Sequence, residues 1–131
     1  MITRINPEGA YPPRGYHHIV TAQGGKHVWL PGQVAYDANR NLIGGADVQL
    51  QTRAVLANIG HRLAAIGAGP EHVVRITTYV VDYQPHHLAG IMEELNAFFG
   101  PENLPTNTLI GVSCLASPSL LVEIEPFAVV P

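Results

Sequence analysis

Residues 47–81 join one clear helix to one clear strand and thereby indicate the fold class. Their sequence is DVQLQTRAVLANIGHRLAAIGAGPEHVVRITTYVV. Its first half repeats apolar residues at helical spacing, namely Val48, Val55, Ile59, Leu63 and Ile66. Asp47 is a suitable N-cap, and the residues GAGP at 67–70 are a strong signal for the end of the helix. Residues 73–81 are rich in β-branched side chains, which predicts a central strand with both faces at least half buried.

Upstream of this stretch, two short β-prone runs flank a pair of glycines. Residues 17–22 and 27–30 lie on either side of Gly24 and Gly25, a pattern typical of a β-hairpin. Residues 1–15 contain three prolines and two glycines and are expected to be irregular. The N-terminal region therefore predicts an irregular lead-in followed by a hairpin.

Downstream, a second helix and two strands complete the pattern. Apolar residues at helical spacing predict a helix over about 86–99, and strands are expected at 108–115 and 120–130. The order hairpin, helix, strand, helix, strand, strand predicts an α+β fold in which two helices pack on one face of a β-sheet. The length suits a single domain over residues 1–131.

The other face of this sheet has no helix to cover it. It is expected to carry Leu121, Phe127 and Val129, and an apolar face of this kind requires burial. Charged residues make up only 13% of the chain, against a typical ~25%, which suits a surface that is partly covered. The economical cover is another copy of the same sheet, so we expect a homo-oligomer.

Composition excludes several kinds of partner. The net charge is −3 and no Lys or Arg follows Arg75, so the chain lacks the clustered cations that bind nucleic-acid phosphates. Cys114 is the only cysteine, which excludes an internal disulfide, and we expect it to be buried in the core. No signal-like segment and no run of ~20 apolar residues occurs, so we expect a cytoplasmic protein that does not bind membranes.

The histidines do not predict a metal site. His17–His18 and His86–His87 are adjacent pairs, and neighbours on a strand point to opposite faces. No His-x-x-x-His or Cys/His spacing occurs. We therefore expect no metal ligands, and surface positions for most of these histidines.

Four segments in register resemble the Rid (reactive intermediate deaminase) family, also called the YjgF family. They are VWLPGQ at 28–33, QTRAVLANI at 51–59, VVRITTYVVD at 73–82 and LVEIE at 121–125, and the resemblance spans about 15–130. It implies a chorismate-mutase-like fold with a mixed β-sheet, and a homotrimer around a central barrel with small-molecule pockets between subunits. It also implies hydrolysis of an enamine or imine to a ketone and ammonia, with no cofactor.

The resemblance assigns a set of site residues, and several depart from the family pattern. Glu123 matches the glutamate that positions the hydrolytic water. Asn107 occupies the place of the arginine that binds the substrate carboxylate. The remaining pocket positions are Tyr16, Gly32, Pro31 in place of a serine, Met92 in place of an asparagine, and Leu109 in place of a cysteine.

The replacement of arginine by Asn107 decides how this site is interpreted. A guanidinium offers a charged, bidentate fork, whereas an amide offers one neutral donor group. The difference corresponds to about ten- to thirtyfold in carboxylate affinity, so the standard 2-imino-acid substrate is not expected. Two hypotheses remain: a deaminase acting on another enamine or imine, and a non-catalytic small-molecule-binding trimer. Ribonuclease activity is disfavoured by the missing cations.

Two of these residues also have ordinary structural interpretations. Glu123 lies between apolar residues on the last strand, where partial burial raises a carboxyl pKa and suits acid–base chemistry. A structural carboxylate hydrogen-bonded across a subunit boundary is the alternative. Tyr16 could donate a hydrogen bond to a ligand or anchor the N-terminal segment.

Overall fold

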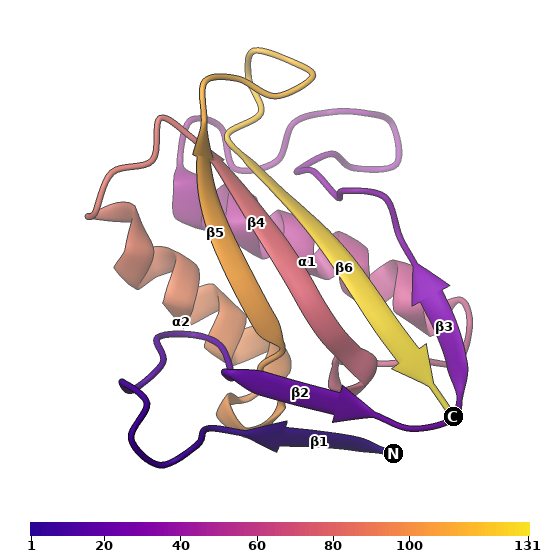
Figure 1. Ribbon diagram of the computed structural model, residues 1–131. Coiled ribbons are helices and arrows are strands. Elements are labelled where there is room, and N and C mark those ends of the chain that lie inside the picture. Colours follow the sequence, from indigo (N-terminus) through magenta and orange to yellow (C-terminus); the bar gives the residue numbers. More distant parts are fainter.

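The computed structural model describes all residues, 1–131, and its centre is a mixed four-stranded sheet in the order β3-β6-β4-β5. The strands are β3 (Lys26–Trp29), β4 (Val73–Val81), β5 (Thr106–Val112) and β6 (Val122–Val130). β4 is parallel to β5, and β6 is antiparallel to both β4 and β3. Figure 1 shows that the two helices, α1 (Val48–Ala64) and α2 (His87–Phe99), lie side by side behind this sheet, which confirms the predicted layers.

The predicted N-terminal hairpin is wrong, because the two β-prone runs belong to different sheets. β1 (Ile2–Ile5), in the segment expected to be irregular, pairs antiparallel with β2 (Ile19–Ala22), whereas β3 pairs with β6. Gly24 and Gly25 do form a turn, with φ of 72° and 80°, in the left-handed region that glycine tolerates best. The turn passes the chain from the small sheet to the main one (Figure 1).

The central helix and strand follow the sequence closely. Asp47 caps α1 by accepting a hydrogen bond from the Leu50 amide over 2.9 Å, and β4 has the predicted bounds. Two single-turn 3-10 helices, η1 (Pro70–His72) and η2 (Pro101–Asn103), follow α1 and α2. β5 ends at Val112, so Cys114 lies beyond the strand and is exposed, contrary to the expectation that it is buried.

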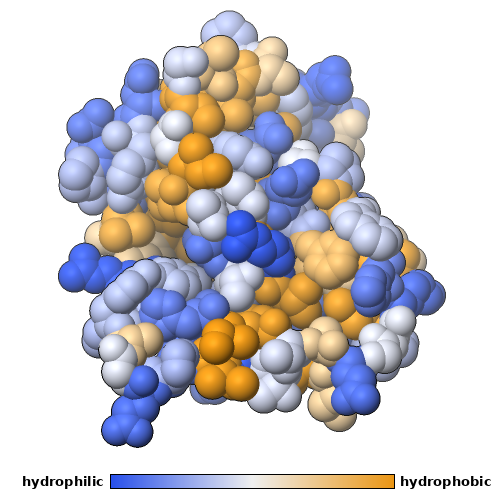
Figure 2. All heavy atoms as spheres, in the orientation of Figure 1, coloured by the Kyte–Doolittle hydropathy of each residue, from blue (hydrophilic) through white to orange (hydrophobic).

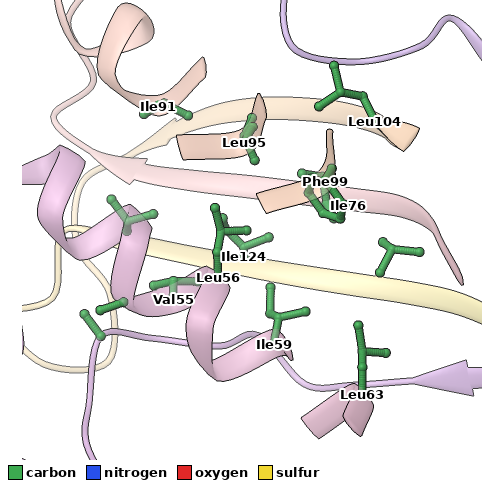
Figure 3. Packing of buried hydrophobic residues seen from close by; sticks show 14 of the residues in the cluster. Val55, Leu56, Ile59, Leu63, Ile76, Ile91, Leu95, Phe99, Leu104 and Ile124 are labelled. Atoms are coloured by element: carbon green, nitrogen blue, oxygen red, sulfur yellow. The ribbon is translucent and has the colours of Figure 1, made fainter. Parts of the chain in front are cut away.

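The hydrophobic core fills the layer between the helices and the sheet (Figure 3). The apolar faces of α1 and α2 pack against side chains from alternate positions of the central strands. The largest fully buried members are Leu56, Ile59, Leu63, Ile76, Ile91, Leu95 and Ile124. Alternation along β6 places Ile124 in this core and therefore sends Glu123 and Glu125 to the opposite face.

The opposite face of the sheet carries no helix. An aromatic cluster lies there, in which the Trp29 ring is 5.2 Å from the Phe127 ring and 72% of Trp29 is exposed. Figure 2 views this face and shows apolar side chains interspersed with hydrophilic ones. Leu121, expected on this face, instead packs against the core, because it precedes the first residue of β6. No helix has the length and apolar content needed to cross a membrane.

Candidate functional site

The first group of candidate residues surrounds Glu123 on the bare face of the sheet. Its half-buried carboxylate lies against the backbone of Gly32, where the carboxyl carbon is 2.6 Å from the position that an alanine Cβ would occupy. Burial raises the pKa of Glu123, and the nearby charge of Glu125 raises it further. A carboxyl group whose pKa moves toward neutrality suits proton transfer in both directions.

The segment 31–33 is held against β6 by hydrogen bonds that fix Gly32 beside Glu123. Gln33 exchanges two backbone hydrogen bonds with Ile124, of 2.8 and 3.1 Å, and its Nε2 donates to the carbonyl oxygen of Pro31 over 3.0 Å. Gln33 itself is buried. The structure therefore brings together three of the residues singled out by sequence, Pro31, Gly32 and Glu123.

The second group lies around β5 and α2. Asn107 pairs in register with Ile76, which is fully buried, so the Asn107 side chain points to the helix side of the sheet. Its Oδ1 accepts a hydrogen bond from the hydroxyl of Thr78 over 3.0 Å. Leu109, two residues on, packs against the hydrophobic core.

Tyr16 and Met92 join this second group through the N-terminal segment. Gly15 is buried against α2, where an added Cβ would lie 3.2 Å from Met92 Cγ. The amide of His17 donates to the Pro105 carbonyl over 3.1 Å, which ties the segment to the approach of β5. The hydroxyl of Tyr16 donates a hydrogen bond to the hydroxyl of Tyr11 over 3.4 Å. This hydrogen bond raises the pKa of Tyr16, and burial raises it further to a smaller extent.

Within one chain the two groups are separate, as expected for a pocket that lies between subunits. The register pairs Glu123 with Tyr79 on the bare face, whereas Asn107 faces the helices from the edge strand β5. The principal surface hollows are lined by other residues. One chain therefore carries two groups of candidate residues on opposite faces of its sheet.

Sequence reasoning missed Thr78 as a member of the candidate site. It has the β-branched shape of a strand residue and is fully buried, so its only signal was a hydroxyl among apolar core positions. No cluster of three or more His, Cys, Asp or Glu side chains is arranged to hold a metal ion.

Two helices on one face of this mixed sheet define an α+β protein of the chorismate-mutase-like fold. The family model described as endoribonuclease L-PSP matches residues 5–130. The crystal structure of YyfB from Yersinia pestis, a conserved Rid-family protein of unknown function, is similar with a TM-score of 0.94, 44% identity and 98% of each chain covered. The chain belongs to the Rid/YjgF family.

Two curated relatives align with this chain over nearly the whole length of both proteins. A RutC family protein of Pyrococcus horikoshii is 33% identical over 125 residues, which cover 95% of this chain and 94% of the relative. The 3-aminoacrylate deaminase RutC of Acinetobacter baylyi is 27% identical over 124 residues, with 95% and 94% covered. A deaminase is therefore among the relatives that align over nearly the whole chain.

Proposed function

We propose that the chain is a small-molecule enzyme that deaminates an enamine, an imine or a related metabolite by hydrolysis, with Glu123 as its acid–base group. The observation that carries this proposal is the Glu123 carboxylate, half-buried against Gly32 with a raised pKa. The deaminase name of one relative supports the same class of reaction.

The reaction needs only water and a series of proton transfers. An enamine first takes a proton on carbon to become an iminium ion. The Glu123 carboxylate then removes a proton from water as the oxygen adds to the iminium carbon, and the resulting carboxylic acid passes that proton to the amine nitrogen. The C–N bond breaks as the new hydroxyl group releases its proton, which gives a carbonyl compound and ammonia. A carboxyl group with a raised pKa suits both the removal and the return of a proton, and such catalysis contributes roughly 10²–10⁴-fold.

The site is completed by a neighbouring copy in a homotrimer. Glu123 and Asn107 lie on different parts of one protomer's surface, so a pocket holding both needs two copies. A two-fold dimer joins identical patches, whereas a closed ring joins two different patches at every interface. In a ring of three, each chain gives its Glu123 side to one pocket and its Asn107 side to another. The bare, partly apolar face of the sheet is then covered.

Asn107 indicates that the substrate is not a 2-imino acid. A carboxylate held by a neutral amide binds about ten- to thirtyfold more weakly than one held by a guanidinium. Substrates that lack a carboxylate at this position do not incur this loss. The alternative function is a trimer that binds a small molecule without turnover. The same substitution supports it, since a family member that lacks the carboxylate-binding arginine can retain the pocket without the reaction.

Ammonia release distinguishes the two functions. Wild type, Glu123→Gln and the matched control Glu125→Gln are compared on freshly generated 2-aminoacrylate and on a panel of uncharged enamines and imines. We expect release from an uncharged member, a loss of at least about 100-fold in Glu123→Gln, and near-wild-type rates in Glu125→Gln. Absence of release across the panel would favour the binding trimer.

A further inference from the structure

We propose that Thr78 orients Asn107 so that the pocket binds its ligand through a neutral hydrogen-bond acceptor, such as an amide, ester or ketone oxygen. This inference rests on the proposed function for the placement of Asn107 in a ligand pocket, and it deepens that function by defining the substrate class. The orientation of the Asn107 amide follows from contacts within one chain.

Thr78 fixes which end of the Asn107 amide is presented. Thr78 is fully buried on β4, and its hydroxyl donates to Asn107 Oδ1 over 3.0 Å. The hydroxyl has no other hydrogen-bond acceptor within the chain. Turning the amide over would leave this buried hydroxyl hydrogen without a partner, which is unfavourable. The amide oxygen therefore stays toward Thr78.

The opposite end of the amide is a donor. Nδ2 of Asn107 makes no hydrogen bond within the chain, and the residue is half-exposed on the edge strand β5. An amide nitrogen carries two N–H donors and no acceptor. A ligand beside Asn107 is therefore bound through an oxygen or nitrogen acceptor, and a ligand that can only donate is rejected.

The charges around this donor disfavour an anion. Arg75, on the neighbouring strand, points to the bare face, where it donates to Thr108 Oγ1 over 2.8 Å, on the other side of the sheet from Asn107. No Lys or Arg follows Arg75 in the chain. An ionised ligand group loses more hydration than a neutral one on entering a pocket, and a neutral donor compensates less of that loss.

Among the Lys and Arg residues, Arg14 is the one closest in sequence to Tyr16 of the second group. It is exposed, makes no hydrogen bond, and lies two residues before Tyr16. It is therefore the residue that could restore a preference for anions, and any test must remove it separately.

Binding of pyruvamide and pyruvate, the neutral and anionic versions of one small ketone, tests the inference by calorimetric titration. We expect wild type to bind pyruvamide about tenfold more tightly than pyruvate. Thr78→Val keeps the side-chain shape but frees the amide to turn and present its oxygen, which repels a carboxylate and accepts from the amide N–H of pyruvamide. The preference for pyruvamide should therefore rise further, by at least about threefold. Thr78→Ser restores the hydroxyl and the wild-type preference, and Arg14→Gln leaves that preference unchanged. A merely structural role for Thr78 would weaken both ligands equally and leave their ratio intact.

The inference is overturned if wild type binds neither compound, if it binds pyruvate as tightly as pyruvamide, or if Thr78→Val keeps the wild-type ratio. If wild type prefers pyruvate and Arg14→Gln loses that preference, the inference is overturned and Arg14 is the residue that binds the anion. If the ratio behaves as expected while no imine is hydrolysed, the proposed catalysis fails and the binding inference stands.

Discussion

Replacing Gly32 with alanine should abolish most activity while leaving the fold intact. Gly32 does not have a positive φ, so an alanine can adopt its backbone conformation without strain. The added Cβ would lie 2.6 Å from Glu123 Cδ and 2.8 Å from Glu123 Cγ, well inside ordinary contact distance. Because the carboxylate is the far end of a flexible side chain, it moves away and the backbone stays in place.

The size of the effect follows from that displacement. To reach ordinary contact the carboxylate must retreat by about 1 Å, and a misplacement of this size costs about 100-fold in rate, or ~2.7 kcal/mol in the activation barrier. Folding stability changes by less, since Gly→Ala at a compatible position stabilises by about 0.4–1 kcal/mol through the unfolded chain and offsets the cost of moving Glu123.

Ammonia-release kinetics and a thermal unfolding curve measure these two quantities. We expect Gly32→Ala to lose about 100-fold in kcat/KM, with a melting temperature within a few degrees of wild type. The double variant Gly32→Ala/Glu123→Gln should be no worse than Glu123→Gln alone, since both changes act on one carboxylate. Full activity in Gly32→Ala would refute the assignment of Glu123 to the reaction.

Two further predictions concern ionisation. Because the charge of Glu125 raises the pKa of Glu123, Glu125→Gln should move the acid limb of the pH–kcat/KM profile to lower pH, and a shift to higher pH would contradict the assignment of that limb. Glu94 is buried beneath Arg53, whose hydrogen bond over 2.8 Å holds the pKa of that carboxyl below its usual range. A lowered folded-state pKa stabilises the fold above the ordinary pKa and loses this effect as pH falls through the lowered value. Arg53→Met should therefore reduce the unfolding free energy at neutral pH, and the difference from wild type should shrink in acid as the pH falls through the lowered pKa of Glu94. An equal difference at neutral and acid pH, measured by denaturant unfolding, would contradict this role of Arg53.

The parts of the fold that the sequence predicted are those set by local periodicity. α1 and β4 are long enough for their apolar spacing to be unambiguous, and Asp47 marks the helix start as expected. The pairing of β3 was missed because its partner, β6, lies about 100 residues later: Lys26 pairs with Val130. Two short β-prone runs around a glycine turn carry no information about a distant partner.

The candidate site, too, could be predicted from the sequence only in part. The resemblance singled out Gly32 and Glu123, and the structure brings them into contact through the bonds of Gln33 to β6. It could not show that Asn107 faces away from Glu123, because strand register decides the face to which each side chain points. Thr78 was missed because a threonine in a strand is ordinary until its hydroxyl is seen to bond Asn107.

Mixing two inactive variants tests whether Glu123 and Asn107 of different chains share one pocket. Glu123→Gln removes one group and Asn107→Asp replaces the donor with an anion. When the two variants are co-expressed in equal amounts, random trimers regain both native groups at about one interface in four, so activity should rise to about a quarter of wild type. If the mixture is no more active than the two variants measured apart, the shared pocket is contradicted.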